Sequence, residues 1–87
     1  MRIKIFIFIL ISQFAFAQTT YVPDDNFEQA LIDLGYDDVL DDYVLTASIS
    51  DVTNLNVEGK EISDLTGIEG FTALTHLQCE YNSLTTL

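Results

Sequence analysis

The sequence is poor in the residues that carry most enzyme chemistry and covalent cross-links. It has one cysteine, one histidine, no tryptophan and three basic residues among 87. A single cysteine excludes a disulfide within the chain, and Cys79 fits a buried thiol better than a reactive one. His76 has no second histidine with which to hold zinc, and no nucleophile elbow or phosphate loop is present. The sequence therefore predicts neither an enzyme nor a bound cofactor.

Basic residues are especially scarce after position 17. All 14 acidic residues follow Ala17, whereas Arg2 and Lys4 precede it. Residues 18–87 thus carry Lys60 as their one basic residue against 14 carboxylates, which gives a formal net charge of −13. Such a surface repels phosphate backbones and anionic lipid headgroups, so nucleic-acid and membrane-surface partners are disfavoured.

Residues 1–17 are typical of a signal peptide. A basic start is followed by the apolar run from Ile5 to Ile11 and by Ala15-Phe16-Ala17, the small-x-small pattern of a signal peptidase site. The run is far shorter than the roughly 20 residues that cross a membrane. Position 18 is glutamine and not cysteine, which argues against a lipoprotein anchor. We expect cleavage after Ala17, no membrane insertion of the mature chain, and a secreted or cell-surface protein.

The last part of the chain repeats at a spacing of 22 residues: VTNLNVEGKEISDL at 52–65 aligns with LTHLQCEYNSLTTL at 74–87. The framework positions are apolar in both copies. They are Val52, Leu55, Val57, Ile62 and Leu65, and then Leu74, Leu77, Cys79, Leu84 and Leu87. This ladder and this period are the signature of a leucine-rich repeat. Ile68, Phe71 and Leu74 are expected to complete the interior of the first coil.

Each repeat predicts one strand and one turn. In an extended segment alternate side chains point to opposite faces, so Leu77 and Cys79 should point inward. The outward positions on the expected concave sheet are the candidate ligand-binding residues Asn54, Asn56, Glu58, His76, Gln78 and Glu80. Asn82 marks the turn, where its amide can bond backbone groups that lack a strand partner. Lys60 stands at that position in the first coil, so its turn must be satisfied differently.

A short amphipathic helix is predicted within residues 21–38. Asp25 is the expected N-cap with Glu28 three residues later, close to a capping box. Phe27, Ala30, Leu31 and Leu34 share one helical face, and Gly35 is placed to end the helix. A solenoid needs its exposed end covered, so we expect a helical N-terminal cap over residues 18–51.

The acidic run after this helix is a weak calcium candidate. Asp37, Asp38, Asp41 and Asp42 lack the ligand order and the mid-loop glycine of an EF-hand. A solvated acidic loop is the favoured interpretation, with at most weak, salt-sensitive calcium binding.

Residues 62–87, ISDLTGIEGFTALTHLQCEYNSLTTL, resemble the 22-residue repeats of internalin-like secreted bacterial leucine-rich-repeat proteins. The resemblance covers residues 52–87 and implies an α/β solenoid that begins with a helical cap. The expected organisation is a signal peptide (1–17), the cap (18–51), a complete coil (52–73) and a partial coil (74–87), about one and a half coils. Because the second coil should end at residue 95, we expect an N-terminal piece of a longer protein, with self-association through the open end.

Two functions compete. The first is a non-enzymatic binding module, because solenoid strands present side chains in a rigid array; the ligand would be an extracellular protein or a glycan. The second is a structural spacer or targeting stalk for a downstream domain. Charged or aromatic outward positions over many coils would favour binding, and bland, variable ones would favour a spacer.

Overall fold

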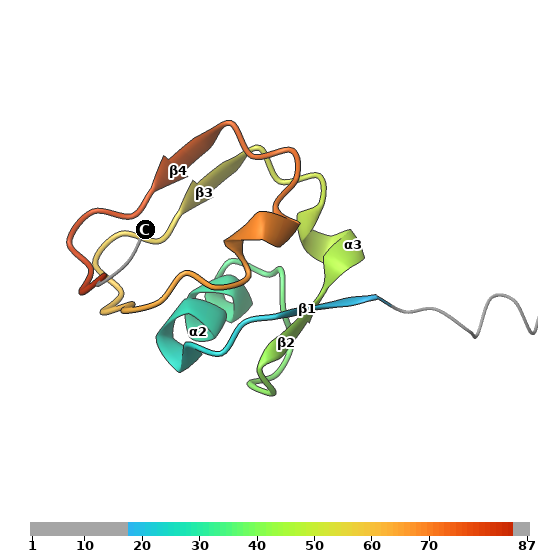
Figure 1. The fold of residues 1–87 in the computed structure, drawn as a ribbon, viewed down its shortest axis with the longest axis horizontal. Helices are drawn as coiled ribbons and strands as arrows, with labels where there is room; N and C mark the ends of the chain where they lie inside the picture. Colours follow the sequence, from blue (N-terminus) through green and yellow to red (C-terminus); the bar gives the residue numbers. More distant parts are fainter. Residues whose placement is uncertain (1–17, 85–87) are drawn as a thin grey trace, which may run out of the picture.

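The computed structural model describes residues 18–84. The expectations for the signal peptide, its cleavage site and Leu87 lie outside this range. In chain order the elements are β1 (Thr19–Tyr21), α2 (Asp25–Asp33), β2 (Tyr43–Leu45), α3 (Thr46–Ile49), β3 (Asn54–Asn56), the 3-10 helix η1 (Ile68–Gly70) and β4 (His76–Gln78) (Figure 1). None of the helices in this range has the length and apolar character needed to cross a membrane.

One full turn of a solenoid lies between β3 and β4. The chain leaves β3, turns, runs back through η1 and returns as β4 beside β3 (Figure 1). The two strands are parallel, with Leu55 opposite Leu77. Parallel strands need a crossover connection, and here the connection is the irregular return segment of a leucine-rich repeat. The repeat predicted from the 22-residue spacing is confirmed.

The predicted framework forms the interior of the coil. The buried side chains include Leu55, Val57, Ile62, Leu65 and Phe71. Removing each from water stabilises the fold by about 1.5–3 kcal/mol. The partly buried positions that pack against them include Ile68, Leu74, Cys79 and Leu84. Leu77 lies opposite the buried Leu55 in the strand register, as predicted for an inward position, but 37% of its surface is exposed. Within residues 18–84, β4 pairs only with β3, so one side of Leu77 is uncovered.

The segment before the coil contains more than the predicted helix. β1 and β2 form an antiparallel pair in which Thr20 lies opposite Val44. Val44 and Val22 are buried in the same core as the coil. The short helix α3 follows β2 directly and buries Ile49. The residues before the coil therefore form a two-stranded pair and a second helical turn besides α2, and their buried side chains share one hydrophobic core with the coil.

Helix α2 follows the prediction with two corrections. Phe27, Ala30 and Leu31 are buried, but Leu34 is 45% exposed because the helix ends at Asp33 and Leu34 is its C-cap. Gly35 then turns the chain with φ of +90°, a left-handed conformation that favours glycine. The N-cap is Asp24 and not Asp25: its carboxylate accepts hydrogen bonds from the backbone N–H of Asn26 and Phe27.

Candidate recognition surface

The outward side chains of β3 and β4, together with the two glutamates that follow these strands, form a small polar array, which we call the strand face: Asn54, Asn56, Glu58, His76, Gln78 and Glu80. The strand register places Asn54 beside His76 and Asn56 beside Gln78. These four side chains are exposed, whereas Glu58 is partly buried. The structure thus brings together the predicted ligand-binding residues of both coils; whether they bind a ligand stays a prediction.

Some strand-face groups already have partners inside the chain. His76 Nδ1 lies 2.9 Å from the Thr75 hydroxyl, which orients the ring. Asn56 Oδ1 accepts the backbone N–H of Glu58 at 3.1 Å and steadies the start of the turn. In contrast, none of the hydrogen bonds within residues 18–84 uses the side chains of Asn54 or Gln78. Their amides remain available to a ligand.

Asn82 serves the turns of both coils. Its Oδ1 accepts the backbone N–H groups of Lys60 and Ile62 at 2.9 and 3.0 Å. Its Nδ2 donates to the carbonyls of Val57 and Cys79 at 2.8 and 2.9 Å. This explains how the first coil tolerates Lys60 at its turn position. The side-chain amide that its backbone lacks is supplied by the next coil.

Asp24 joins α2 to the first coil. Its Oδ1 caps the helix, and its Oδ2 accepts the backbone N–H groups of Ser63 and Asp64 at 2.8 and 3.0 Å and the Ser63 hydroxyl at 3.1 Å. Burial would raise the pKa of Asp24, but the hydrogen bonds, the one from Ser63 foremost, outweigh it and lower that pKa. Asn26 adds a bond from Nδ2 to the Glu61 carbonyl at 2.9 Å.

Glu28 is the centre of an acidic cluster that sequence reasoning missed. It is fully buried on α2, and its carboxylate accepts the backbone N–H of Asp42 at 2.9 Å and of Asp41 at 3.3 Å. Burial and the neighbouring Asp37 carboxyl raise the pKa of Glu28 to about 7. Asp37 Oδ2 is buried and has no hydrogen-bond partner within residues 18–84.

The predicted calcium quartet is only partly assembled. Carboxylate oxygens of Asp37, Asp41 and Glu28 lie within 4.8 Å of one another, and those of Asp42 join Glu28 and Asp25 in a second group. Asp38 belongs to neither group; its backbone N–H instead donates to Asp37 Oδ1 at 2.8 Å. Glu28 belongs to both groups, and its raised pKa weakens its charge near neutral pH and thus its attraction for a cation. Weak calcium binding stays a prediction.

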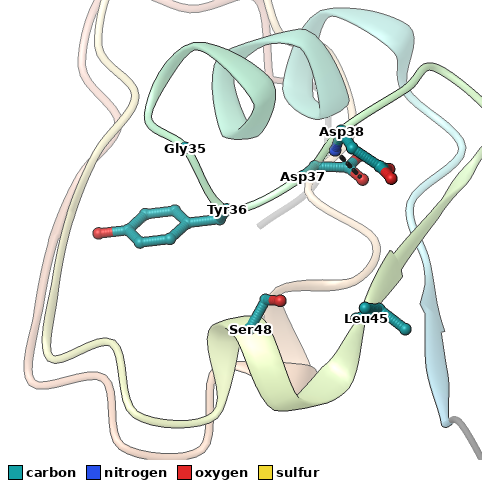
Figure 2. Close-up of a pocket in the computed structure, with 6 residues that line it drawn as sticks. All are labelled: Gly35, Tyr36, Asp37, Asp38, Leu45 and Ser48. Carbon is teal, nitrogen blue, oxygen red and sulfur yellow. Dashed lines mark hydrogen bonds between the residues drawn. The ribbon is translucent and has the colours of Figure 1, made fainter.

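Two hollows flank these features. One, of about 190 Å³, lies between the connection after α2, the end of β2 and α3 (Figure 2). Asp37 and Asp38 both line it, so this hollow borders the acidic run. Figure 2 shows the Tyr36 ring pointing away from these two aspartates. The other, of about 290 Å³, lies between α2 and the first coil and is lined in part by Asn56 and Glu58. It therefore borders the strand face.

Comparison with known proteins shows similarity to internalin J, whereas no protein-family model matches the chain. Internalin J of Listeria monocytogenes serotype 4b (strain F2365) is 36% identical over 67 residues, which are 77% of this chain and 7% of that protein. The solved functional domain of InlJ from Listeria monocytogenes, described as including a cysteine ladder, has a TM-score of 0.64 and 33% identity. That match covers 82% of this chain and 16% of the solved one.

The chain thus spans a small fraction of the length of either relative. Over that fraction the sequence identity, the parallel β3–β4 pair and the 22-residue framework agree. The chain is therefore an internalin-like leucine-rich-repeat protein.

Proposed function

We propose that the chain is part of a non-enzymatic recognition module and that it binds a protein ligand on the strand face. The relationship to internalin leucine-rich-repeat domains favours protein interaction in general terms. The strand face gives this proposal its residues. Short strands held by a packed interior present side chains at fixed spacing, which lowers the ordering cost of binding.

The observation that carries the proposal is the β3–β4 register. It aligns exposed polar side chains in two adjacent rows, Asn54 with His76 and Asn56 with Gln78. The fold makes no use of the Asn54 and Gln78 side chains within the described part of the chain. A spacer has no need for such an array. Amides and carboxylates can hydrogen-bond glycans as well as proteins, so a glycan is the alternative ligand.

In the same proposal, α2 with the β1–β2 pair is the N-terminal cap. Its support is the packing of the Phe27 ring on Phe71, with centroids 6.5 Å apart, and the anchoring of Asp24 to Ser63 and Asp64. Residues 1–17 would direct export, which places the module outside the cell. Mass spectrometry that finds Gln18 at the N-terminus of the exported protein would support this; an intact Met1 would contradict it.

The binding proposal is tested by affinity capture with cross-linking on the natural full-length protein. The strand-face variant Asn54→Ala/His76→Ala/Gln78→Ala should lose a partner that the wild type retains. The control variant Ser48→Ala/Asp51→Ala changes two exposed residues that are not part of the strand face and should retain the partner. If both variants capture the same partners, the strand face does not bind them and the spacer function gains support.

A further inference from the structure

The hollow between α2 and the first coil has opposed walls of different chemistry. One wall is formed by Ala30 and Asp33 of α2 and its C-cap Leu34, and the other by Asn56 at the end of β3 and by Glu58 and Lys60 in the turn after it. Its volume of about 290 Å³ is enough for one large side chain of a partner. Because Asn56 and Glu58 also belong to the strand face, a ligand lying on that face can reach into the hollow.

The walls match an elongated cationic group. Leu34 is 45% exposed at the end of α2 and offers an aliphatic surface, with Ala30 beside it. Asp33 and Glu58 place a carboxylate on each wall. One oxygen of Asp33 accepts Gln29 Nε2 at 3.0 Å, and the other takes part in no hydrogen bond within the described residues. Lysine and arginine bury their methylene stems against apolar surface while their charged ends meet carboxylates.

We propose that this hollow receives one basic side chain, arginine or lysine, of a protein partner bound across the strand face. The inference rests on the proposed function and adds the chemistry of the partner. Charge complementarity supports it, because residues 18–87 carry 14 carboxylates and a single lysine. A field of that sign attracts basic partners and speeds their encounter.

Lys60 places a positive charge at the hollow. As the sole basic residue of this part of the chain, it lines the hollow together with the two carboxylates. A positive charge beside the hollow repels an incoming cation. Removing its charge should therefore strengthen the binding of a basic side chain, whereas removing either carboxylate should weaken it.

The test is an NMR titration of the full chain with three capped tripeptides, acetyl-Gly-X-Gly-amide with X as arginine, lysine or glutamate. A basic tripeptide should give saturable shifts at the amides of Asp33, Leu34 and residues 56–60. Asp33→Asn and Glu58→Gln should each weaken binding about three-fold or more, and Lys60→Gln should tighten it. Asp51→Asn removes the same charge at an exposed position away from the hollow and should change the affinity less than two-fold.

Several outcomes would overturn the inference: neither basic tripeptide binding, tighter binding of the glutamate tripeptide, or equal losses from Asp51→Asn and Asp33→Asn. Misfolding cannot produce the opposite sign expected for Lys60→Gln. A failure of the proposed function can be distinguished from a failure of this inference. If the strand-face variant keeps its natural partner while the tripeptide pattern holds, the hollow binds a basic side chain, but the partner does not lie across the strand face. If the variant loses its partner and the tripeptide pattern fails, the proposed function stands and only the basic-side-chain inference is wrong.

Discussion

Asn82 accepts the backbone N–H of Lys60, one repeat earlier in the sequence, at 2.9 Å. The same carboxamide bonds Ile62 N–H and the carbonyls of Val57 and Cys79, so one side chain completes the turns of two successive coils. Ile62 and Val57 are buried, and their backbone groups would find no water in its place. The coil-to-coil interface therefore depends on this residue as well as on apolar packing.

Replacing this amide should be costly, and replacing Lys60 should not. Asn82→Ala leaves several backbone groups unpaired and should lower the free energy of unfolding by about 2–4 kcal/mol. Lys60→Asn restores the usual turn residue but should change stability by less than about 0.5 kcal/mol, because Asn82 already serves that turn. Urea denaturation measures both. A large gain from Lys60→Asn would show that the first turn is poorly satisfied in the native chain.

The two adjacent aspartates before α2 should behave differently. Asp24→Ala removes the helix cap and the bonds to Ser63 and Asp64, and should cost about 2–3 kcal/mol. Asp25→Ala should cost about 0.5 kcal/mol or less, because Asp25 is exposed in the first turn. Thermal and urea unfolding of both variants under the same conditions provide the comparison. Equal losses would mean that the link to the first coil contributes nothing.

Asp24 also predicts acid sensitivity. Its folded-state pKa is lower than the ordinary value of 3.8, so its stabilisation is present above that value and is lost as the pH falls through the folded pKa. Asp24→Asn keeps the Oδ1 acceptor for the helix cap but removes the titration. The stability of this variant should therefore fall less between pH 5 and acid conditions than that of the wild type. An unchanged acid profile would exclude Asp24 as its source.

The sequence predicted the solenoid because the signal is local and periodic. The alternation around Leu55 and the 22-residue spacing are visible without knowing any tertiary contact. The N-cap could not be chosen in the same way, since Asp24 and Asp25 have identical capping chemistry. The choice is made by Ser63 and Asp64, which bond Asp24 from 39 and 40 residues away.

Two other features were hidden for similar physical reasons. β1 and β2 have three residues each, too few for an alternating pattern to be recognised. Glu28 in a capping box and Glu28 buried beneath a loop look the same in sequence, because only the position of Asp41 and Asp42 in space distinguishes them. The strand face was predictable from alternation, whereas the hollow beside it depends on where α2 packs.

Glu28 predicts a stability change of the opposite sign to that of Asp24. Its pKa rises from 4.5 to about 7 on folding, first through burial and then through Asp37, while the N–H groups of Asp42 and Asp41 partly offset the rise. The stabilisation is therefore complete below pH 4.5 and is lost as the pH rises through 7. Glu28→Gln keeps an acceptor for the loop and cannot ionise. It should be more stable than the wild type at pH 8 by on the order of 2 kcal/mol.

Urea unfolding at pH 5 and pH 8 tests this difference. The exposed Glu61→Gln is the control and should show the same pH dependence as the wild type. If Glu28→Gln were destabilised equally at both pH values, loss of packing rather than ionisation would explain it.

The last prediction concerns the contact between the coil and β1. Gly67 has φ of +108°, and a Cβ there would lie 2.7 Å from both the Tyr21 carbonyl oxygen and Val22 Cγ2. Gly59 has φ of +67°, and a Cβ added to it would meet no atom within 4 Å, so this position isolates the backbone cost from the clash. Gly59→Ala should cost about 1 kcal/mol. Gly67→Ala should cost about 3 kcal/mol or more, because β1 or the return segment must move as well. Urea unfolding of the two variants decides the matter: equal losses would show that β1 moves aside freely, and that the close approach of Tyr21 to the return segment adds nothing to stability.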